Sequence, residues 1–226
     1  MYDVNVIFSV HQECGKCNTE ELYKIIEGIR PDVIFEELDY IDFNYAYKEQ
    51  KPFTLETETI NKFLQNYNIE HIPVDTYKAA DYTKEISINA EKFLSENSSE
   101  YKKLISIHKK FTSEYGFDFL NSKQYYDLIR EVRTQEEILY KSTDNEEYKS
   151  NCAIELKANN NREIEIIKNI YLYSKEHEYN KAIFIFGVYH SYGLKKKIQE
   201  YKEEETKLNW IFNTRDLPVC SIYLKS

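Results

Sequence analysis

The sequence predicts an α/β fold, with a mainly parallel sheet built from βαβ units, helices flanking it, and a helical insert or cap. Short apolar runs rich in β-branched residues recur along the chain and are typical of buried strands. Stretches with apolar residues at helical intervals separate these runs, and strand, helix and strand within about 35 residues form a parallel βαβ unit. The 226 residues, 42% of them hydrophobic, suffice for a single domain over residues 1–226.

The first third of the chain has the clearest βαβ pattern. Asn18 stands three residues before Glu21, which is the spacing of a capping box at a helix start, and Pro31 ends that helix. The expected elements are a strand at Val4–Val10, a helix over about 18–30, a strand at Val33–Phe35, a helix at Glu56–Tyr67 and a strand at Ile69–Asp75.

The rest of the chain begins with a long helical region. Residues 77–150 have helical spacing and many Lys, Glu and Tyr residues, which predicts an insert or cap over the strand ends, or a layer on one face of the sheet. The elements expected next are a helix from Asn159–Asn161 to Glu178, a strong strand at Lys181–Gly187, a helix at Gly193–Glu203, and closing strands at Asn209–Phe212 and Val219–Leu224 of undetermined direction.

Charge and composition restrict the partners. A net charge of −9 and a pI near 5.2 argue against a binder of duplex nucleic acid, which normally presents a basic face. The N-terminus lacks the basic region of a signal peptide, no run approaches the ~20 apolar residues of a membrane span, and four cysteines without an export signal indicate reduced thiols. We expect a cytoplasmic protein with a small-molecule or peptide substrate and no nucleic-acid or membrane partner, and a homodimer stays open.

Polar side chains follow three of the predicted strands. His11 follows the first, Glu36 and Glu37 end the second, and His190 follows the strong late strand. Ligands of open α/β sheets bind outside the carboxyl ends of the strands, so we expect these residues to meet. Two histidines and a carboxylate suit zinc, manganese, cobalt or iron. Adjacent residues of a strand point to opposite faces, so only one of the two glutamates can face such a site.

Two motifs resemble the superfamily that groups TraB and pheromone-shutdown proteins, Tiki proteases, erythromycin esterases and ChaN-like haem-binding proteins. The segment PDVIFEELD is similar to the TraB pattern of Pro-Asp, an apolar run and Glu-Leu-Asp, which selects Glu37. The segment FGVYHSYGL resembles the family's Gly-x-x-His with a following glycine, and it matches at Gly187, His190 and Gly193.

Further residues match the family less specifically. Arg162, flanked by Asn161 and Glu163, looks like the family's Arg-acidic helix motif, and Asp75 matches a strand-terminal aspartate. The resemblance implies His11, Glu37, Arg162 and His190 as catalytic residues, Glu36, Asp75, Gly187 and Gly193 as ligand-binding residues, and His11, Glu37 and His190 as metal ligands.

One departure from the family stands before His11. The first family motif is usually Gly-x-x-His, whereas this chain reads FSVH with Phe8 at the glycine position. Glycine would let backbone approach the site closely, so its loss bears on the geometry beneath His11.

The cysteines and tyrosines offer alternatives. His11 lies three residues before Cys14, and Cys14 and Cys17 form a Cys-x-x-Cys ahead of a helix, which suggests thiol redox chemistry, a structural zinc site or bystander thiols. The 21 tyrosines, many of them in residues 77–150, could grip a planar ligand or fill helix interfaces.

Two functions follow from the resemblance. The first is a hydrolase of the TraB, Tiki and erythromycin-esterase type, cleaving a peptide or ester bond, in which His11, Glu37 and His190 hold a divalent metal or act directly as acid and base while Arg162 stabilises negative charge. The second is a ChaN-like module that binds haem or another planar ligand without catalysis, with a histidine as axial ligand.

Overall fold

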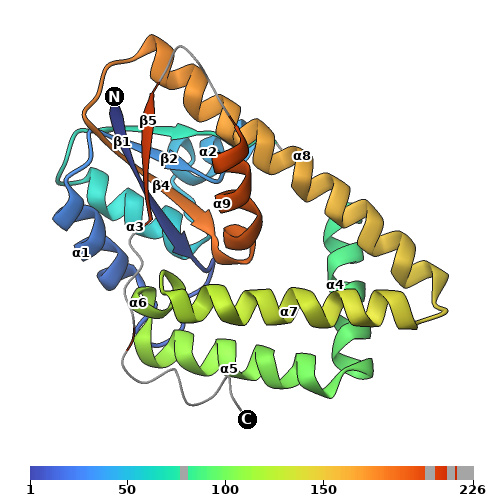
Figure 1. The fold of residues 1–226 in the computed structure, drawn as a ribbon. Helices are drawn as coiled ribbons and strands as arrows, with labels where there is room; N and C mark the ends of the chain where they lie inside the picture. Colours follow the sequence, from blue (N-terminus) through green and yellow to red (C-terminus); the bar gives the residue numbers. More distant parts are fainter. Residues whose placement is uncertain (77–80, 202–206, 213–216, 218–226) are drawn as a thin grey trace.

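A five-stranded, all-parallel sheet forms the centre of the molecule, so the predicted α/β fold is confirmed (Figure 1). This computed structural model describes residues 1–76, 81–201, 207–212 and 217. The strands are β1 (Tyr2–Ser9), β2 (Val33–Glu36), β3 (Glu70–Pro73), β4 (Lys181–Gly187) and β5 (Leu208–Phe212), in the order β3-β2-β4-β1-β5.

The helices connect and cover these strands. They are α1 (Thr19–Ile29), α2 (Tyr40–Phe43), the π-helix η1 (Asn44–Lys48), α3 (Leu55–Leu64), α4 (Asp81–Asn97), α5 (Ser99–Tyr115), α6 (Phe117–Leu120), α7 (Lys123–Ser142), α8 (Glu146–Glu176), the 3₁₀ turn η2 (Val188–His190) and α9 (Ser191–Glu200).

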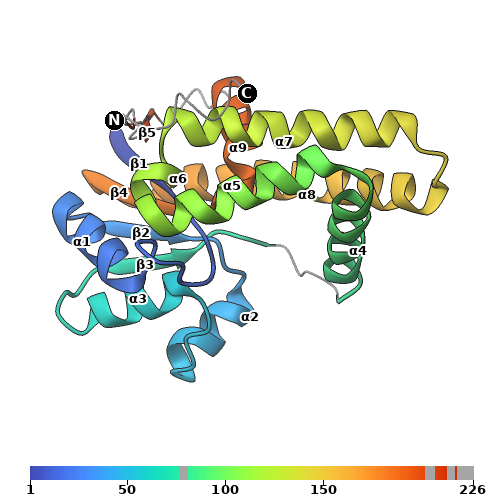
Figure 2. The same ribbon diagram turned by 90° about the horizontal axis from the view of Figure 1, so that it is seen from below.

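The central strands are buried on both faces. From Val4 to Ser9 and from Ala182 to Gly187 every residue is buried, which is the pattern of a parallel sheet with helices on each side. Helices α1 and α3 pack together on one face, whereas α9 and the second half of α8 cover the other (Figures 1 and 2). Burial on both faces explains why these strands appear in the sequence as continuous apolar runs.

The predicted helical region is present but extends further than expected. Helices α4, α5 and α7 and the first half of α8 form a layer that projects beyond the sheet (Figure 2). The prediction of a boundary near Ser150 and a new helix at Asn159–Asn161 was wrong, because α8 is one continuous helix. Its N-cap is Asn145, whose side chain accepts a hydrogen bond from the Tyr148 backbone N–H (2.9 Å). Burial of Ile166, Ile167 and Ile170 on the sheet outweighs the low helix propensity of asparagine.

Most of the other expected elements are confirmed within a few residues. The strand at Lys181–Gly187 has the predicted bounds, and Asn18 caps α1 through the Glu21 backbone N–H (3.0 Å). The closing strand at Asn209–Phe212 is β5, and it runs parallel to β1. The strand predicted at Val219–Leu224 lies outside the described residues. No helix in the part of the chain that the structure describes has both the length and the apolar character needed to cross a membrane.

The strand order creates a crevice at the carboxyl ends of β1 and β4. The chain leaves β1 through α1 toward β2, but it leaves the neighbouring β4 through α9 toward β5, on the opposite side. Such a reversal between adjacent strands is where α/β sheets usually bind ligands. His11, which follows β1, and His190, which follows β4, therefore flank this crevice.

Candidate functional site

A cavity of about 260 Å³ opens at this edge of the sheet. Five of the residues predicted for the site line it, and the predicted Asp75, Gly187 and Gly193 stand behind or beside those five. The lining residues are His11, Glu36, Glu37, Leu38, Asp42, Phe53, Thr54, Glu56, Thr57, Ile60, Arg162, Ile185 and His190.

Arg162, on α8, connects most of the charged groups of the cavity. Its Nε donates to Asp75 Oδ2 (2.7 Å), its Nη2 donates to Glu37 Oε1, and its Nη1 lies 3.3 Å from His190 Nε2. Burial opposes its charge, but the carboxylates of Glu37 and Asp75 outweigh that effect and raise the pKa of Arg162. The guanidinium is therefore a permanent cation that fixes three strand-end residues relative to one another.

His190 is held from both sides. Its Nδ1 lies 2.8 Å from Glu163 Oε1, and Glu163 also accepts a hydrogen bond from Lys197 Nζ. Burial tends to raise the pKa of Glu163, but these two hydrogen bonds overcome it and lower that pKa, so Glu163 is a carboxylate that accepts from His190 Nδ1–H. An arginine only donates, so His190 Nε2 accepts from Arg162, and the ring is the neutral Nδ1–H tautomer.

The two motif glycines give these carboxylates room. A methyl group on Gly187 would lie 3.1 Å from Glu37 Oε2, which accepts the Gly187 backbone N–H. A methyl group on Gly193 would lie 2.7 Å from Glu163 Oε2. Each glycine therefore permits a close approach to a site carboxylate.

Both adjacent glutamates line the cavity, contrary to the expectation that only one of them faces it, because Glu37 lies just beyond the end of β2; their carboxylates have different partners. Glu37 faces Arg162, whereas Glu36 accepts from Tyr47 Oη and lies 2.7 Å from His71 Nδ1. Glu36 is therefore not solvated and instead faces a helix, the π-helix η1 that carries Tyr47. Glu36 is only 2% exposed because η1 and β3 cover it. This burial raises the pKa of Glu36 despite the contact with His71.

His11 lies at the rim of the cavity and is 60% exposed. It is not part of the Arg162 network: its Nδ1 lies 3.3 Å from Glu56 Oε1. The interaction with Glu56, first through the contact at Nδ1 and also through its negative charge, raises the pKa of His11 to about 9, and the partial loss of solvent at the cavity rim opposes this rise without cancelling it. His11 is therefore a protonated imidazolium at neutral pH, facing a cavity whose other histidine is neutral.

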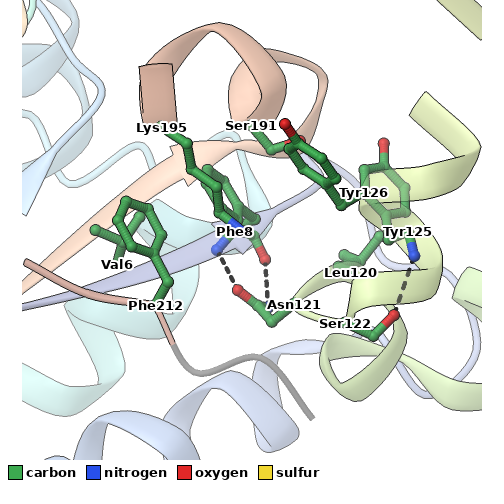
Figure 3. Close-up of a pocket in the computed structure, with 10 residues that line it drawn as sticks. All are labelled: Val6, Phe8, Leu120, Asn121, Ser122, Tyr125, Tyr126, Ser191, Lys195 and Phe212. Atoms are coloured by element: carbon green, nitrogen blue, oxygen red, sulfur yellow. Dashed lines mark hydrogen bonds between the residues drawn. The ribbon is translucent and has the colours of Figure 1, made fainter. Parts of the chain in front are cut away.

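Phe8, three residues before His11, does not line this cavity. Its ring is buried and stacks against Phe212, and the Asn121 side chain binds its backbone N–H (2.8 Å) and C=O (3.1 Å) (Figure 3). The space beside it, about 10 Å³, has room for roughly one water molecule. Phe8 therefore packs toward α6 and β5 and contributes nothing to the lining of the cavity that contains His11.

The predicted metal ligands do not fit a shared ion in this arrangement. Glu37 Oε1 and His190 Nε2, the atoms that would bind it, both contact the Arg162 guanidinium, whose positive charge repels a metal ion. No group of three or more His, Cys, Asp or Glu side chains is arranged to hold a metal ion within the described residues.

The cavity also fits haem poorly. Pockets for drug-sized ligands usually have roughly 300–1,000 Å³, more than this cavity provides. His190 Nδ1 is bonded to Glu163, and the Arg162 guanidinium lies 3.3 Å from Nε2, where its bulk and positive charge oppose a haem iron.

The thiols of the loop after β1 are poor candidates for redox chemistry. Cys17 is fully buried, and burial raises the pKa of its thiol to about 12, which removes the reactive thiolate. Cys14 and Cys17 exchange backbone hydrogen bonds (2.8 and 3.0 Å) and are free thiols. The tyrosines of the helical layer mainly fill interfaces, since Tyr101, Tyr125 and Tyr148 belong to its buried core.

Sequence reasoning did not select Glu56, Lys197 or the Tyr47–His71 pair. Glu56 lies in the first turn of α3, where an acidic residue normally reads as a helix-dipole partner. Lys197 belongs to a run of lysines that reads as a solvated helix face. A useful signal was the spacing of Lys197 from Gly193, one helical turn, which places both on the side of α9 that meets Glu163.

Comparison with known proteins gives no match to this chain: no family model, no curated protein and no solved structure is significantly similar to it.

Proposed function

We propose that this chain is a hydrolase that cleaves a peptide or ester bond at the cavity between His11 and His190. One observation carries the proposal: a neutral histidine held by a buried carboxylate and a protonated histidine line the same cavity. Hydrolysis of a carbonyl compound needs a group that removes a proton from water and a group that protonates the leaving atom. The resemblance of the Glu-Leu-Asp and Gly-x-x-His motifs to those of TraB-like hydrolases agrees with this class of reaction.

His190 acts as the general base. Glu163 binds Nδ1–H and thereby directs the lone pair of Nε2 toward the cavity, as the carboxylate does in a carboxylate–histidine pair. The contact of Nε2 with Arg162 is long, at 3.3 Å, and a water molecule replaces it when substrate binds. Nε2 then takes a proton from this water as the water oxygen attacks the carbonyl carbon.

His11 acts as the general acid. Glu56 holds its Nδ1, so Nε2–H is the proton that it can give. When the tetrahedral intermediate collapses, the bond from carbon to the leaving oxygen or nitrogen breaks, and His11 protonates that atom. The products are a carboxylic acid and an alcohol or amine; His190 releases its proton to the solvent and His11 takes one up, which restores both groups.

Arg162 and Glu37 position the base. The three guanidinium nitrogens contact Asp75, Glu37 and His190, which suits Arg162 to fixing the ends of β2 and β4 relative to each other. Glu37 binds both Arg162 and the Gly187 backbone N–H, so it links the guanidinium to the turn that carries His190. We therefore assign the two residues a positioning role in addition to the charge that they bring to the cavity.

The test is a screen of chromogenic esters and peptide anilides with purified protein. We expect turnover by the wild type, a loss of at least about 100-fold in His190→Gln, and no change in the control His177→Gln, because His177 is exposed at the end of α8.

Two outcomes of this screen contradict the proposal. The first is equal activity of His190→Gln and the wild type. The second is the absence of turnover together with a Soret band after hemin addition, which supports the binding module instead. Assays with chelator, and with added Zn²⁺ or Mn²⁺, separate direct acid–base catalysis from metal-dependent hydrolysis.

A further inference from the structure

We propose that the cavity selects substrates that carry an ammonium group next to the carbonyl under attack, such as the amino-terminal residue of a peptide or an amino-acid ester. This inference rests on the proposed function and specifies its substrate class. It is drawn from the charges of the cavity, the partners of Glu56 and the size of the space.

The charges that line the cavity are mainly negative. Besides the buried Glu36, which is bonded to Tyr47 and His71, three carboxylates, Glu37, Asp42 and Glu56, line the cavity together with the two cations Arg162 and His11. Each cation is already bonded to a carboxylate, Arg162 to Glu37 and Asp75, and His11 to Glu56. The group that complements the remaining charge is therefore a cation.

Glu56 provides the point at which that cation binds. Its Oε1 contacts His11 Nδ1 at 3.3 Å, whereas its Oε2 is buried without a hydrogen-bond partner in the described structure. The side chain is 13% exposed and lies on the cavity wall. A buried carboxylate oxygen without a donor leaves this carboxylate incompletely satisfied, and an ammonium N–H at its exposed edge supplies a charge-assisted hydrogen bond to the group.

Asp42 adds negative charge at the mouth of the cavity. Partial burial, followed by repulsion from Asp39 and Asp75, raises its pKa. The part of this rise that comes from Asp39 and Asp75 reflects a negative potential around Asp42, which a bound cation relieves. Asp42 and Glu56 thus present carboxylates from α2 and α3, two different elements, to one space.

The remaining lining fits one apolar side chain. Leu38, Ile60 and Ile185 form apolar wall, and Phe53 stands 46% exposed beside the opening. A volume of about 260 Å³ holds a small molecule or one end of a longer one. An amino-terminal residue, with an ammonium group, an apolar side chain and a carbonyl, combines the features that the lining requires.

The first experiment measures binding alone. L-leucinamide and N-acetyl-L-leucinamide differ in the charge of the amino group, and isothermal titration calorimetry gives the affinity of each for the full chain. We expect the free amine to bind about 10- to 100-fold more tightly, which corresponds to one charge-assisted hydrogen bond. Glu56→Gln should abolish this preference, Asp42→Asn should reduce it, and Glu58→Gln, exposed on the same helix, should keep it.

The second experiment measures turnover of L-leucine p-nitroanilide, L-leucine p-nitrophenyl ester and their N-acetyl forms. We expect the N-acetyl forms to have kcat/KM about 10- to 100-fold lower, and the anilide and ester arms distinguish a peptide from an ester substrate. Equal turnover of free and acetylated substrates overturns the inference but leaves the hydrolase intact. Absence of turnover with a retained preference for the free amide overturns the hydrolase but supports the ammonium site. Equal binding of the two amides overturns the inference in either case.

Discussion

The substitution Glu163→Gln should destabilise the protein by about 3 kcal/mol. Removing one partner of a buried ion pair costs roughly 3–5 kcal/mol, because the other charge stays buried without compensation. The Glu163 side chain is 5% exposed and serves both His190 and Lys197. Lys197, at 16% exposure, keeps its hydrogen bond to Asn160 Oδ1 (2.8 Å), so the lower end of the range applies.

Urea unfolding at pH 7 measures this change, and Glu165→Gln provides the matched control on the same helix. Glu165 is 48% exposed and pairs with Lys168 at the surface, so its substitution should change stability by only about 0–1 kcal/mol. The pKa of Glu163 lies below its ordinary value of 4.5, so its contribution is present above that pH and is lost as the pH falls through the folded-state pKa. Equal stability of the two variants at pH 7 would refute the buried Glu163 network.

Three further predictions concern Gly193, Arg162 and the loop after β1 that carries Cys17. Gly193→Ala should lower stability by about 1–3 kcal/mol, measured by thermal unfolding, because its methyl group would lie 2.7 Å from Glu163 Oε2. Arg162→Lys should lower kcat/KM on the order of 100-fold with the fold retained, since one ammonium cannot hold three partners; an unchanged rate contradicts the positioning role. Cys17 should react with iodoacetamide at pH 8 only after unfolding, and Cys17→Ser should keep activity; rapid labelling of the folded protein contradicts its buried thiol.

The strands and their shared edge could be predicted because their signals are local. Helices cover both faces of the sheet at Lys181–Gly187, so this strand is buried on both sides and appears in the sequence as an uninterrupted apolar segment. The placement of His11, Glu37 and His190 around one cavity follows from strand ends alone.

The start of α8 could not be predicted, because the local pattern points elsewhere. Three consecutive asparagines, Asn159–Asn161, favour caps and turns, yet they lie within a helix that tertiary packing holds together. The same limit applies to η1, a π-helix with no sequence signature, which brings Tyr47 over Glu36 and buries that glutamate.

The partners of the site residues were the other missing part. From the sequence, His11, Glu37 and His190 were expected to bind one ion together. In the structure each has a different partner: His11 contacts Glu56, Glu37 binds Arg162, and His190 binds Glu163. These partners come from α3 and α8, and only the packing of those helices on the sheet decides which carboxylate reaches which imidazole.

The dependence of kcat/KM on pH tests the acid–base assignment most directly, since it reports the ionisation of groups in the free enzyme. Activity should require protonated His11 and should therefore fall as the pH rises through about 9, the raised pKa of that imidazole. In Glu56→Gln the hydrogen bond and charge that raise this pKa are weakened, so the fall should move toward the ordinary histidine value of 6.5. A fall at the same pH in Glu56→Gln and the wild type would contradict the account.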